Sequence, residues 1–318
     1  MGAGRVLLLT DASSDAHAVS GHPERPERRA AAVAGFRLGA GDRLEEASVA
    51  PIDDVELSAT HDPAYLEALG RMDAAGGGWL DADTFVVPGS LRAARLAAGA
   101  TVQAGVDATD GSAEVAFAAV RPPGHHAGRT RGRGFCLLNN VAVAVTGLRS
   151  RGLAERIAII DWDVHHGDGT QSIFDADPGL CYASTHQGDF YPGTGSAAET
   201  GEGAGRGTMH NRPLAAGTAD AGFIAAWGEL LVAVEAFRPD ALLVSAGYDA
   251  HVDDPLAGLA VTEDGFESVA RLVGGLSARL GLAGVAMTLE GGYHLDAVRD
   301  SVAASIRGLL DGRARTGP

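Results

Sequence analysis

The sequence of 318 residues lacks lysine, and all 25 of its basic side chains are arginine. This absence excludes a lysine Schiff base, a lysine general base and a phosphate-binding loop with its lysine. Only two cysteines occur, Cys136 and Cys181, and neither has a C-x-x-C partner, so no zinc ribbon, redox pair or disulfide framework is predicted. No apolar segment reaches the roughly 18 residues of a membrane span, and we predict no contact with membranes.

The composition, 46% hydrophobic and 21% charged, is that of a soluble globular protein. The formal net charge of -16 disfavours direct nucleic-acid binding, which needs a basic face, and permits a cationic substrate. The apolar run at residues 6–9 is too short for a secretory signal, and we expect a cytoplasmic protein. Composition alone indicates neither a function nor an oligomeric state.

Short apolar runs alternate with longer stretches in which apolar residues recur three or four positions apart. The runs predict strands at 6–9, 115–120, 157–161, 180–184, 241–245 and 285–289, and the stretches predict helices near 24–38, 63–72, 90–107, 139–151, 219–237, 263–281 and 295–311. Such alternation is typical of a parallel sheet between helices, and no long linker interrupts it, so we predict one α/β domain over residues 1–318. The glycine-rich segment 201–207 fails the spacing of nucleotide-binding motifs, and we expect a flexible surface loop there.

The segment DWDVHHGDGT at 161–170 follows a predicted buried strand and is the densest cluster of metal-binding and proton-handling side chains. Ligands bind at the carboxyl ends of strands in such sheets. Side chains two residues apart point the same way in an extended chain, so Asp161, Asp163 and His165 can converge, and an Asp-x-His pair suits a divalent metal. The alternative interpretation is a set of capping residues at the start of a helix.

The segment RPPGHHA at 121–127 also follows a predicted strand. Its adjacent histidines, His125 and His126, project in different directions, which favours two separate proton-transfer or hydrogen-bonding groups over two ligands of one metal. A structural role is the alternative for both histidines.

Two further strand ends carry Asp249 and, after two glycines, Tyr293, whose phenol can donate a hydrogen bond into a site. Each segment alone is compatible with an ordinary turn, but together they form the arrangement that a metal-assisted hydrolase needs.

Two aromatic residues, Phe190 and Tyr191, lie in the stiff loop HQGDFYPGTG at 186–195. Together with Phe135 they would form a narrow slot for an extended apolar chain, unless they simply pack beneath the loop. Cys136 is expected to be a small packing residue near the site.

Several motifs of this chain resemble those of a known protein family. RPPGHHA, GFCLLNN (134–140), DWDVHHGDGT, YPGTG (191–195), the segment around Asp249 and EGGY (290–293) resemble motifs of the histone deacetylase superfamily, and HPERPER (22–28) resembles its amino-terminal motif. The resemblance covers nearly the whole chain and looks closest to bacterial class II-like members, grouped with acetoin utilization proteins and acetylpolyamine amidohydrolases. It implies the arginase-deacetylase fold and a zinc-dependent amidohydrolase that removes an acyl group from an N-acetylated amine by means of metal-activated water.

The resemblance also implies roles for individual residues. One Zn²⁺ per chain, or Fe²⁺ or Co²⁺, would be held by Asp163, His165 and Asp249. The catalytic residues would be the proton-transfer pair His125 and His126, their carboxylate partners Asp161 and Asp168, and Tyr293, which would polarise the substrate carbonyl. The substrate-binding residues would be Gly134, Phe135, Tyr191 and Arg28. A structural K⁺ would lie near Asp161 and Ser184.

Acetyl-lysine in a peptide, an acetylpolyamine and a small N-acetyl metabolite all present a similar narrow arm, although the short segments 76–88 and 128–133 weaken the polyamine reading. Two rival functions stay open. A binuclear manganese hydrolase of the arginase type would bind two metals, but the chain has DVHH where an Asp-x-His-x-Asp pattern would stand. A non-catalytic acyl-ligand sensor would be expected to have lost part of the catalytic set, which is complete here.

Overall fold

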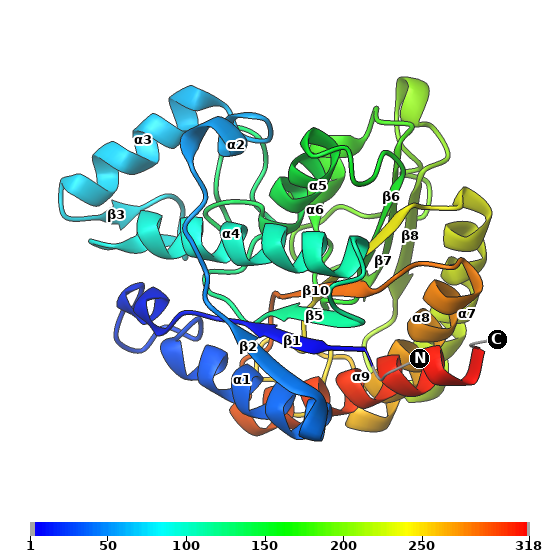
Figure 1. The fold of residues 1–318 in the computed structure, drawn as a ribbon. Helices are drawn as coiled ribbons and strands as arrows, with labels where there is room; N and C mark the ends of the chain where they lie inside the picture. The colour runs from blue at the N-terminus through cyan, green and yellow to red at the C-terminus, as the bar shows by residue number, and fades with distance from the viewer. Residues whose placement is uncertain (1–3, 317–318) are drawn as a thin grey trace.

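The computed structural model describes residues 4–316. Residues 1–3 and 317–318 of the predicted domain lie outside the described residues, and the first three belong to the amino terminus for which no secretory signal is predicted. An eight-stranded sheet, parallel throughout, forms the centre of the molecule (Figure 1). Across the sheet the strands follow the order β2 (Leu44–Ala47), β1 (Val6–Leu9), β5 (Val115–Ala118), β10 (Val285–Leu289), β9 (Ala241–Ala246), β6 (Ile157–Asp161), β7 (Leu180–Gln187) and β8 (Met209–Leu214). The predicted α/β class is confirmed.

The six predicted strands all occur in this sheet, and its other two strands, which sequence reasoning missed, are the edge strands. β2 reads LEEA and β8 reads MHNRPL, with partly exposed residues in both. Edge strands need not be apolar on both faces and tolerate charge and proline, so they lack the continuous apolar signal of the central strands. A small hairpin of β3 (Gly78–Trp79) and β4 (Phe85–Val86) was also not predicted.

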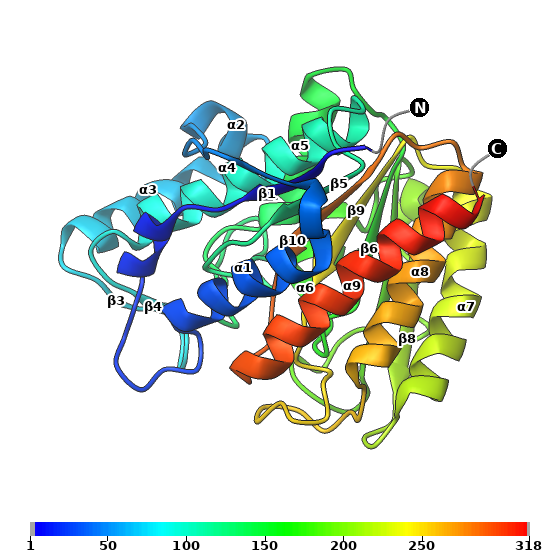
Figure 2. The same ribbon diagram turned by 60° about the horizontal axis from the view of Figure 1, so that its bottom comes forward.

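Helices cover both faces of the sheet (Figures 1 and 2). One face carries α4 (Ser90–Thr109) and α5 (Asn140–Ser150), against which α3 (Pro63–Ala74) and α2 (Asp54–Ser58) pack. The other face carries α1 (Pro26–Ala40), α7 (Asp220–Phe237), α8 (Glu263–Arg279) and α9 (Leu295–Thr316). Helix α6 (Asp168–Phe174) follows β6 directly.

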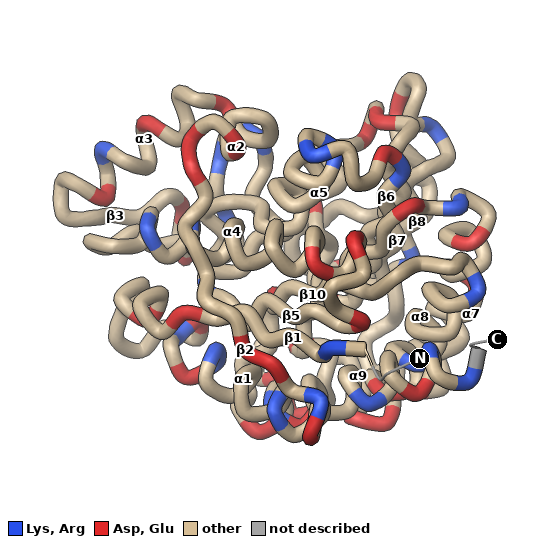
Figure 3. The backbone as a smooth tube through the Cα atoms, in the orientation of Figure 1, with Lys and Arg blue, Asp and Glu red and all other residues tan. Residues whose placement is uncertain are grey.

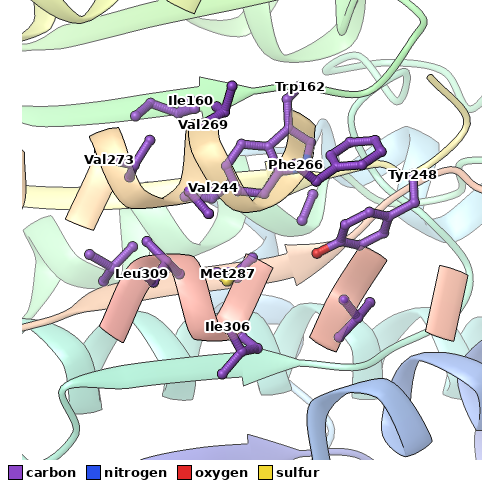
Figure 4. Close-up of a cluster of buried hydrophobic side chains, with 14 of the residues drawn as sticks. Ile160, Trp162, Val244, Tyr248, Phe266, Val269, Val273, Met287, Ile306 and Leu309 are labelled. Atoms are coloured by element: carbon purple, nitrogen blue, oxygen red, sulfur yellow. The ribbon is translucent and has the colours of Figure 1, made fainter. Parts of the chain in front are cut away.

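A hydrophobic core fills each layer between sheet and helices. Figure 4 shows part of the core between the sheet and helices α8 and α9. Val269 and Val273 of α8 and Ile306 and Leu309 of α9 pack there over the sheet residues Val244 and Met287. Burial of apolar surface on both faces explains why the central strands are so rich in valine, isoleucine, leucine and alanine. The carboxyl ends of five adjacent strands, β5, β10, β9, β6 and β7, are thereby fixed along one edge of the sheet.

The structure also bears on the predictions made from composition about membranes, cysteines, charge and the glycine-rich segment. No helix among the described residues combines the length and the hydropathy needed to cross a membrane. Cys136 and Cys181 are both buried and free. Figure 3 shows arginine and acidic segments interspersed along the outer helices and loops. The glycine-rich loop at 201–207 contains a short 3-10 turn (Gly203–Gly205) and packs on the end of α6, where the backbone N–H of Glu202 donates to the carbonyl of Asp175.

His61 joins two loops that shape the edge of the sheet. Its Nδ1 lies 3.0 Å from the carbonyl oxygen of Gly128, and the backbone N–H of Asn139 donates to its Nε2 at 2.9 Å. Asn139 in turn caps α5 by accepting from the N–H of Ala142. These contacts require the neutral imidazole with its proton on Nδ1, and burial lowers the pKa of His61 to about 4.

We therefore expect His61 to make the protein sensitive to acid. The pKa of the folded state lies below the ordinary 6.5, so the stability linked to this group is complete above pH 6.5 and is lost as the pH falls toward 4. The free energy of unfolding of wild-type protein should fall, relative to His61→Gln, by about 1.4 kcal/mol per pH unit in that window. Urea unfolding at a series of pH values measures this difference, and identical slopes for the two proteins would refute it.

Candidate active site and metal centre

Asp163, His165 and Asp249 converge at the edge of the sheet beyond β6 and β9. One ligand atom from each lies within 4.8 Å of the others, and among residues 4–316 no other group of three or more potential ligands meets this criterion. The backbone holds the two carboxylates, because the N–H of Gly291 donates to Asp163 and that of Val164 donates to Asp249. The remaining oxygen of Asp249, Oδ2, is buried without a hydrogen-bond partner and lies 3.2 Å from His165 Nδ1.

The electrostatics of this cluster favour a cation. Burial lowers the pKa of His165, but Asp163 and Asp249 outweigh burial and raise it to about 10. Burial and the charge of Asp163 raise the pKa of Asp249. Two buried carboxylates therefore need positive charge between them, and an acceptor atom without a partner is available to bind it. The donor set of two carboxylates and one imidazole suits zinc, ferrous iron or cobalt, and three protein ligands leave a position for substrate or water.

Gly291 packs directly against the metal cluster. A Cβ at this position would overlap the carboxylates of both Asp249 and Asp163. We expect Gly291→Ala to displace both ligands and to lower metal affinity by about 10- to 100-fold, the range found when groups around metal ligands are disturbed. Isothermal titration with Zn²⁺ measures this. Gly228→Ala in α7, where a Cβ meets nothing within 4 Å, is the control, and equal affinities for the two variants would contradict the prediction.

The two adjacent histidines each face a different carboxylate. Nδ1 of His125 lies 3.1 Å from Oδ2 of Asp161, which also accepts a hydrogen bond from the hydroxyl of Tyr182. Nδ1 of His126 lies 2.7 Å from Oδ1 of Asp168 at the start of α6. The structure thus brings together the four residues that the sequence resemblance paired. Asp161, although on the same segment as the cluster, lies beneath His125 and is not among the three potential ligands.

The pKa values of the two histidines move in opposite directions. Burial lowers the pKa of His125, but the charges of Asp163 and Asp161 outweigh it and raise the value well above 6.5. Burial and the charge of His125 lower the pKa of His126 to about 3, although the hydrogen bond that Asp168 accepts from this ring opposes the shift. One imidazole of the pair is therefore charged at neutral pH and the other neutral.

Tyr293 is 8% exposed and faces the cluster from the loop after β10. Its backbone N–H donates to Asp254 at 2.7 Å, and its ring packs between the guanidinium of Arg28 at 4.7 Å and the ring of Phe135 at 5.8 Å. Burial raises the pKa of its phenol, so the hydroxyl stays protonated. Within residues 4–316 this hydroxyl forms no hydrogen bond, and it is therefore a free donor.

A narrow channel leads to these groups. Its cavity of about 260 Å³ is lined by Asp83, Pro123, His125, His126, Gly134, Phe135, His165, Phe190, Tyr191, Leu256, Gly291 and Tyr293. Phe190 stacks on His165 with a centroid distance of 5.5 Å, and Tyr191, 38% exposed, lies at the mouth. A larger hollow of about 700 Å³ lies beside the loop 186–199, but its lining includes none of the three potential ligands. The smaller channel is thus the candidate site.

Gly134 and Phe135 enter this channel through a tight turn in which both residues have positive φ, 55° and 68°. Arg28 is the fourth residue predicted to bind substrate, and it lies behind the wall of the channel. It is fully buried behind the ring of Tyr293, where it donates to the carbonyls of Gly292 and Glu290, and it does not line the cavity. The ring of Tyr293 separates it from the channel, and its role in substrate binding stays a prediction.

Sequence reasoning missed several residues that hold this site together. Glu290 accepts from the backbone N–H groups of Gly124 and His125 and from the hydroxyl of Ser245, which ties the tyrosine loop to the histidine loop. Asp254 holds Tyr293, as described above. Burial raises the pKa of both carboxyls to about 7. Glu290 lay inside a recognised motif, so its place beside two glycines was a usable signal, but Asp254 carried none.

The fold and the site together define a class of protein: a hydrolase-like α/β protein with a candidate metal centre, two histidine–carboxylate pairs and a tyrosine at the end of a channel. Comparison with known proteins agrees. The family model described as "Histone deacetylase domain" matches residues 22–309. The chain belongs to the histone deacetylase family, and the resemblance inferred from its motifs is confirmed.

Named relatives show the same relationship. "Histone deacetylase-like amidohydrolase" of Pseudomonas aeruginosa is 37% identical over 280 residues, which cover 87% of this chain and 73% of the relative. "Histone deacetylase 15" of Arabidopsis thaliana is 38% identical over 296 residues, but these span only 53% of the plant protein. The crystal structure of the HDA15 HD domain superposes with a TM-score of 0.91 at 36% identity, covering 97% of this chain and 90% of that one. The chain has the arginase-deacetylase fold, and its relatives support a deacetylase activity.

Proposed function

We propose that the protein is a zinc-dependent deacylase that hydrolyses the amide of an N-acetylated amine. The observation that carries this proposal is the position of the buried ligand cluster beside two histidine–carboxylate pairs and a free tyrosine hydroxyl at the end of a narrow channel. A cavity of about 260 Å³ fits an acyl-amide arm better than a bulky ring system.

The metal would be held by Asp163, His165 and Asp249. When bound, zinc supplies Lewis acidity and lowers the pKa of water to about 7 in favourable sites. His126, neutral because its pKa is about 3, is the group able to accept a proton from the attacking water and to return it to the leaving amine. The charged His125, held by Asp161, would stabilise the negative charge that develops on the oxygen atoms around the reacting carbon.

Tyr293 would donate its free hydroxyl to the substrate carbonyl oxygen. This hydrogen bond strengthens as negative charge develops on that oxygen, so it favours the transition state over the substrate. Phe135, Phe190 and Tyr191 would hold the alkyl part of the arm, and the carbonyl of Gly134 would accept from the amide N–H. Asp161 and Ser184 are register partners on β6 and β7, and a structural K⁺ beside them is part of the proposal.

The substrate classes proposed are an acetyl-lysine peptide, an acetylpolyamine and a small N-acetyl metabolite. Purified protein supplied with Zn²⁺ is incubated with an acetyl-lysine peptide, acetylputrescine, acetylspermidine and simple N-acetyl amines, and acetate release is measured. Release from one class supports the hydrolase and identifies its substrate family. Bound metal without release from any of them would favour an acyl-ligand sensor, and urea release from a guanidino substrate would favour the manganese alternative.

A further inference from the structure

Arg133 lies where three parts of the channel meet. Its backbone pairs with that of Cys136 in both directions, at 3.1 and 2.9 Å, and so closes the turn that carries Gly134 and Phe135 into the channel. Its side chain is 22% exposed and points across the mouth toward the opposite wall. Nothing in the sequence motifs distinguished this arginine from Arg129 or Arg131 in the same loop.

The guanidinium of Arg133 binds two groups at once. Its Nη1 lies 3.1 Å from Oδ2 of Asp168, whose other oxygen faces Nδ1 of His126 at 2.7 Å. Its Nε donates to the hydroxyl of Tyr191 at 3.0 Å, and the guanidinium carbon lies 5.1 Å from the centroid of the same ring. Tyr191 in turn meets the ring of His126 edge to face, with a centroid distance of 5.1 Å.

We propose that Arg133 is a positioning residue that fastens the Asp168–His126 pair and the Tyr191 wall to the turn bearing Phe135. The inference rests on the proposed function and deepens it, because one side chain sets both the orientation of a proton-transfer group and the width of the channel mouth. Arginine suits this role, since its planar fork offers several donors in fixed directions, whereas a lysine ammonium is a single point charge.

The two contacts of Arg133 predict two separable effects. The contact with Asp168 acts on the orientation of His126, so its loss lowers kcat. The contact with Tyr191 acts on the channel wall, so its loss raises KM. A residue that merely supported the fold would lower the fraction of active enzyme, and with it the apparent kcat, but it would leave KM unchanged.

The test compares Arg133→Met, Arg133→Lys and Tyr191→Phe on the best substrate of the panel above. Arg133→Met is expected to lower kcat about tenfold, less than the roughly 10²- to 10⁴-fold that a positioned proton-transfer group contributes, because Asp168 still holds His126, and to raise KM. Tyr191→Phe should raise KM about two- to tenfold with kcat near the wild-type value, as expected for one hydrogen bond. Arg133→Lys should restore most of kcat but keep the higher KM. Adding Tyr191→Phe to Arg133→Lys should change nothing more, because both remove the same hydrogen bond.

Arg131→Met is the matched control. Arg131 is an exposed arginine of the same loop, and within the described part of the chain its side chain forms no hydrogen bond or ion pair. It should behave as wild type. Equal kinetics for Arg133→Met and Arg131→Met would overturn the inference while leaving the proposed function intact.

Amide hydrogen exchange of the loop 188–195 gives a readout that does not depend on turnover. Arg133→Met should exchange faster than wild type in this loop, and Arg131→Met should not. If wild-type protein released no acetate from any substrate, the proposed function would fail, but the exchange comparison would still decide the positioning role. Unchanged exchange in Arg133→Met would count against it.

Discussion

Tyr293→Phe is expected to lower kcat by about 10²- to 10³-fold, the usual cost of removing one hydrogen-bond donor to a developing oxyanion. The substitution removes only the hydroxyl. The ring keeps its packing against Arg28 and Phe135, and the backbone keeps its hydrogen bond to Asp254. We therefore expect KM and metal affinity to stay near their wild-type values, because the lost interaction is made chiefly in the transition state.

Tyr248→Phe provides the control for Tyr293→Phe. Tyr248 is fully buried next to the potential ligand Asp249, but its hydroxyl lies in the core near Ser305 and not in the channel (Figure 4). The two variants undergo the same chemical change at neighbouring loops. Steady-state kinetics should separate them by at least two orders of magnitude, and near-normal turnover by Tyr293→Phe would remove this residue from the proposed mechanism.

Asp249→Ala is expected to abolish acetate release and the stabilisation that metal gives to the fold. A ligand present at 100 times its Kd stabilises a folded protein by about 2.7 kcal/mol, so Zn²⁺ should raise the Tm of wild-type protein by several degrees. In Asp249→Ala the carboxylate with the free buried oxygen is gone, and the metal-dependent rise in Tm should disappear. Differential scanning calorimetry with and without Zn²⁺ measures each variant against its own metal-free state.

Asp253→Ala, four residues away and exposed, is the matched control for Asp249→Ala. It should keep the full rise in Tm with Zn²⁺. A rise of equal size in Asp249→Ala would mean that the metal binds elsewhere on the chain, and the assignment of the centre would be wrong.

The sequence predicts much of this molecule for a clear physical reason. The runs at 6–9, 157–161 and 285–289 are apolar without alternation because helices cover both faces of the sheet, and their bounds agree with those of β1, β6 and β10. Since parallel strands end at one edge, the polar residues after them had to meet, and Asp163, His165 and Asp249 do so. Local pattern and topology were sufficient for the strands and their common edge, whereas the choice of these three residues as a ligand set came from the resemblance to the histone deacetylase superfamily.

The contacts that organise the site were not predictable in the same way. Glu290 meets Gly124 across 166 positions, and the hydrogen bond from Arg133 to Tyr191 spans 58. Such pairs depend on how loops fold over the strand ends, and an isolated arginine or glutamate carries no signal of its partner. Arg28 shows the converse, since its motif was recognised but its packing behind Tyr293 depends on tertiary structure.

A zinc titration of metal-free protein, followed by acetate release from the best substrate of the panel, tests the central claim most directly. The proposed mononuclear deacylase predicts that activity rises with added Zn²⁺ and reaches a plateau at one equivalent per chain, while Asp249→Ala stays inactive throughout. A plateau at two equivalents, or bound zinc without any acetate release, would contradict it.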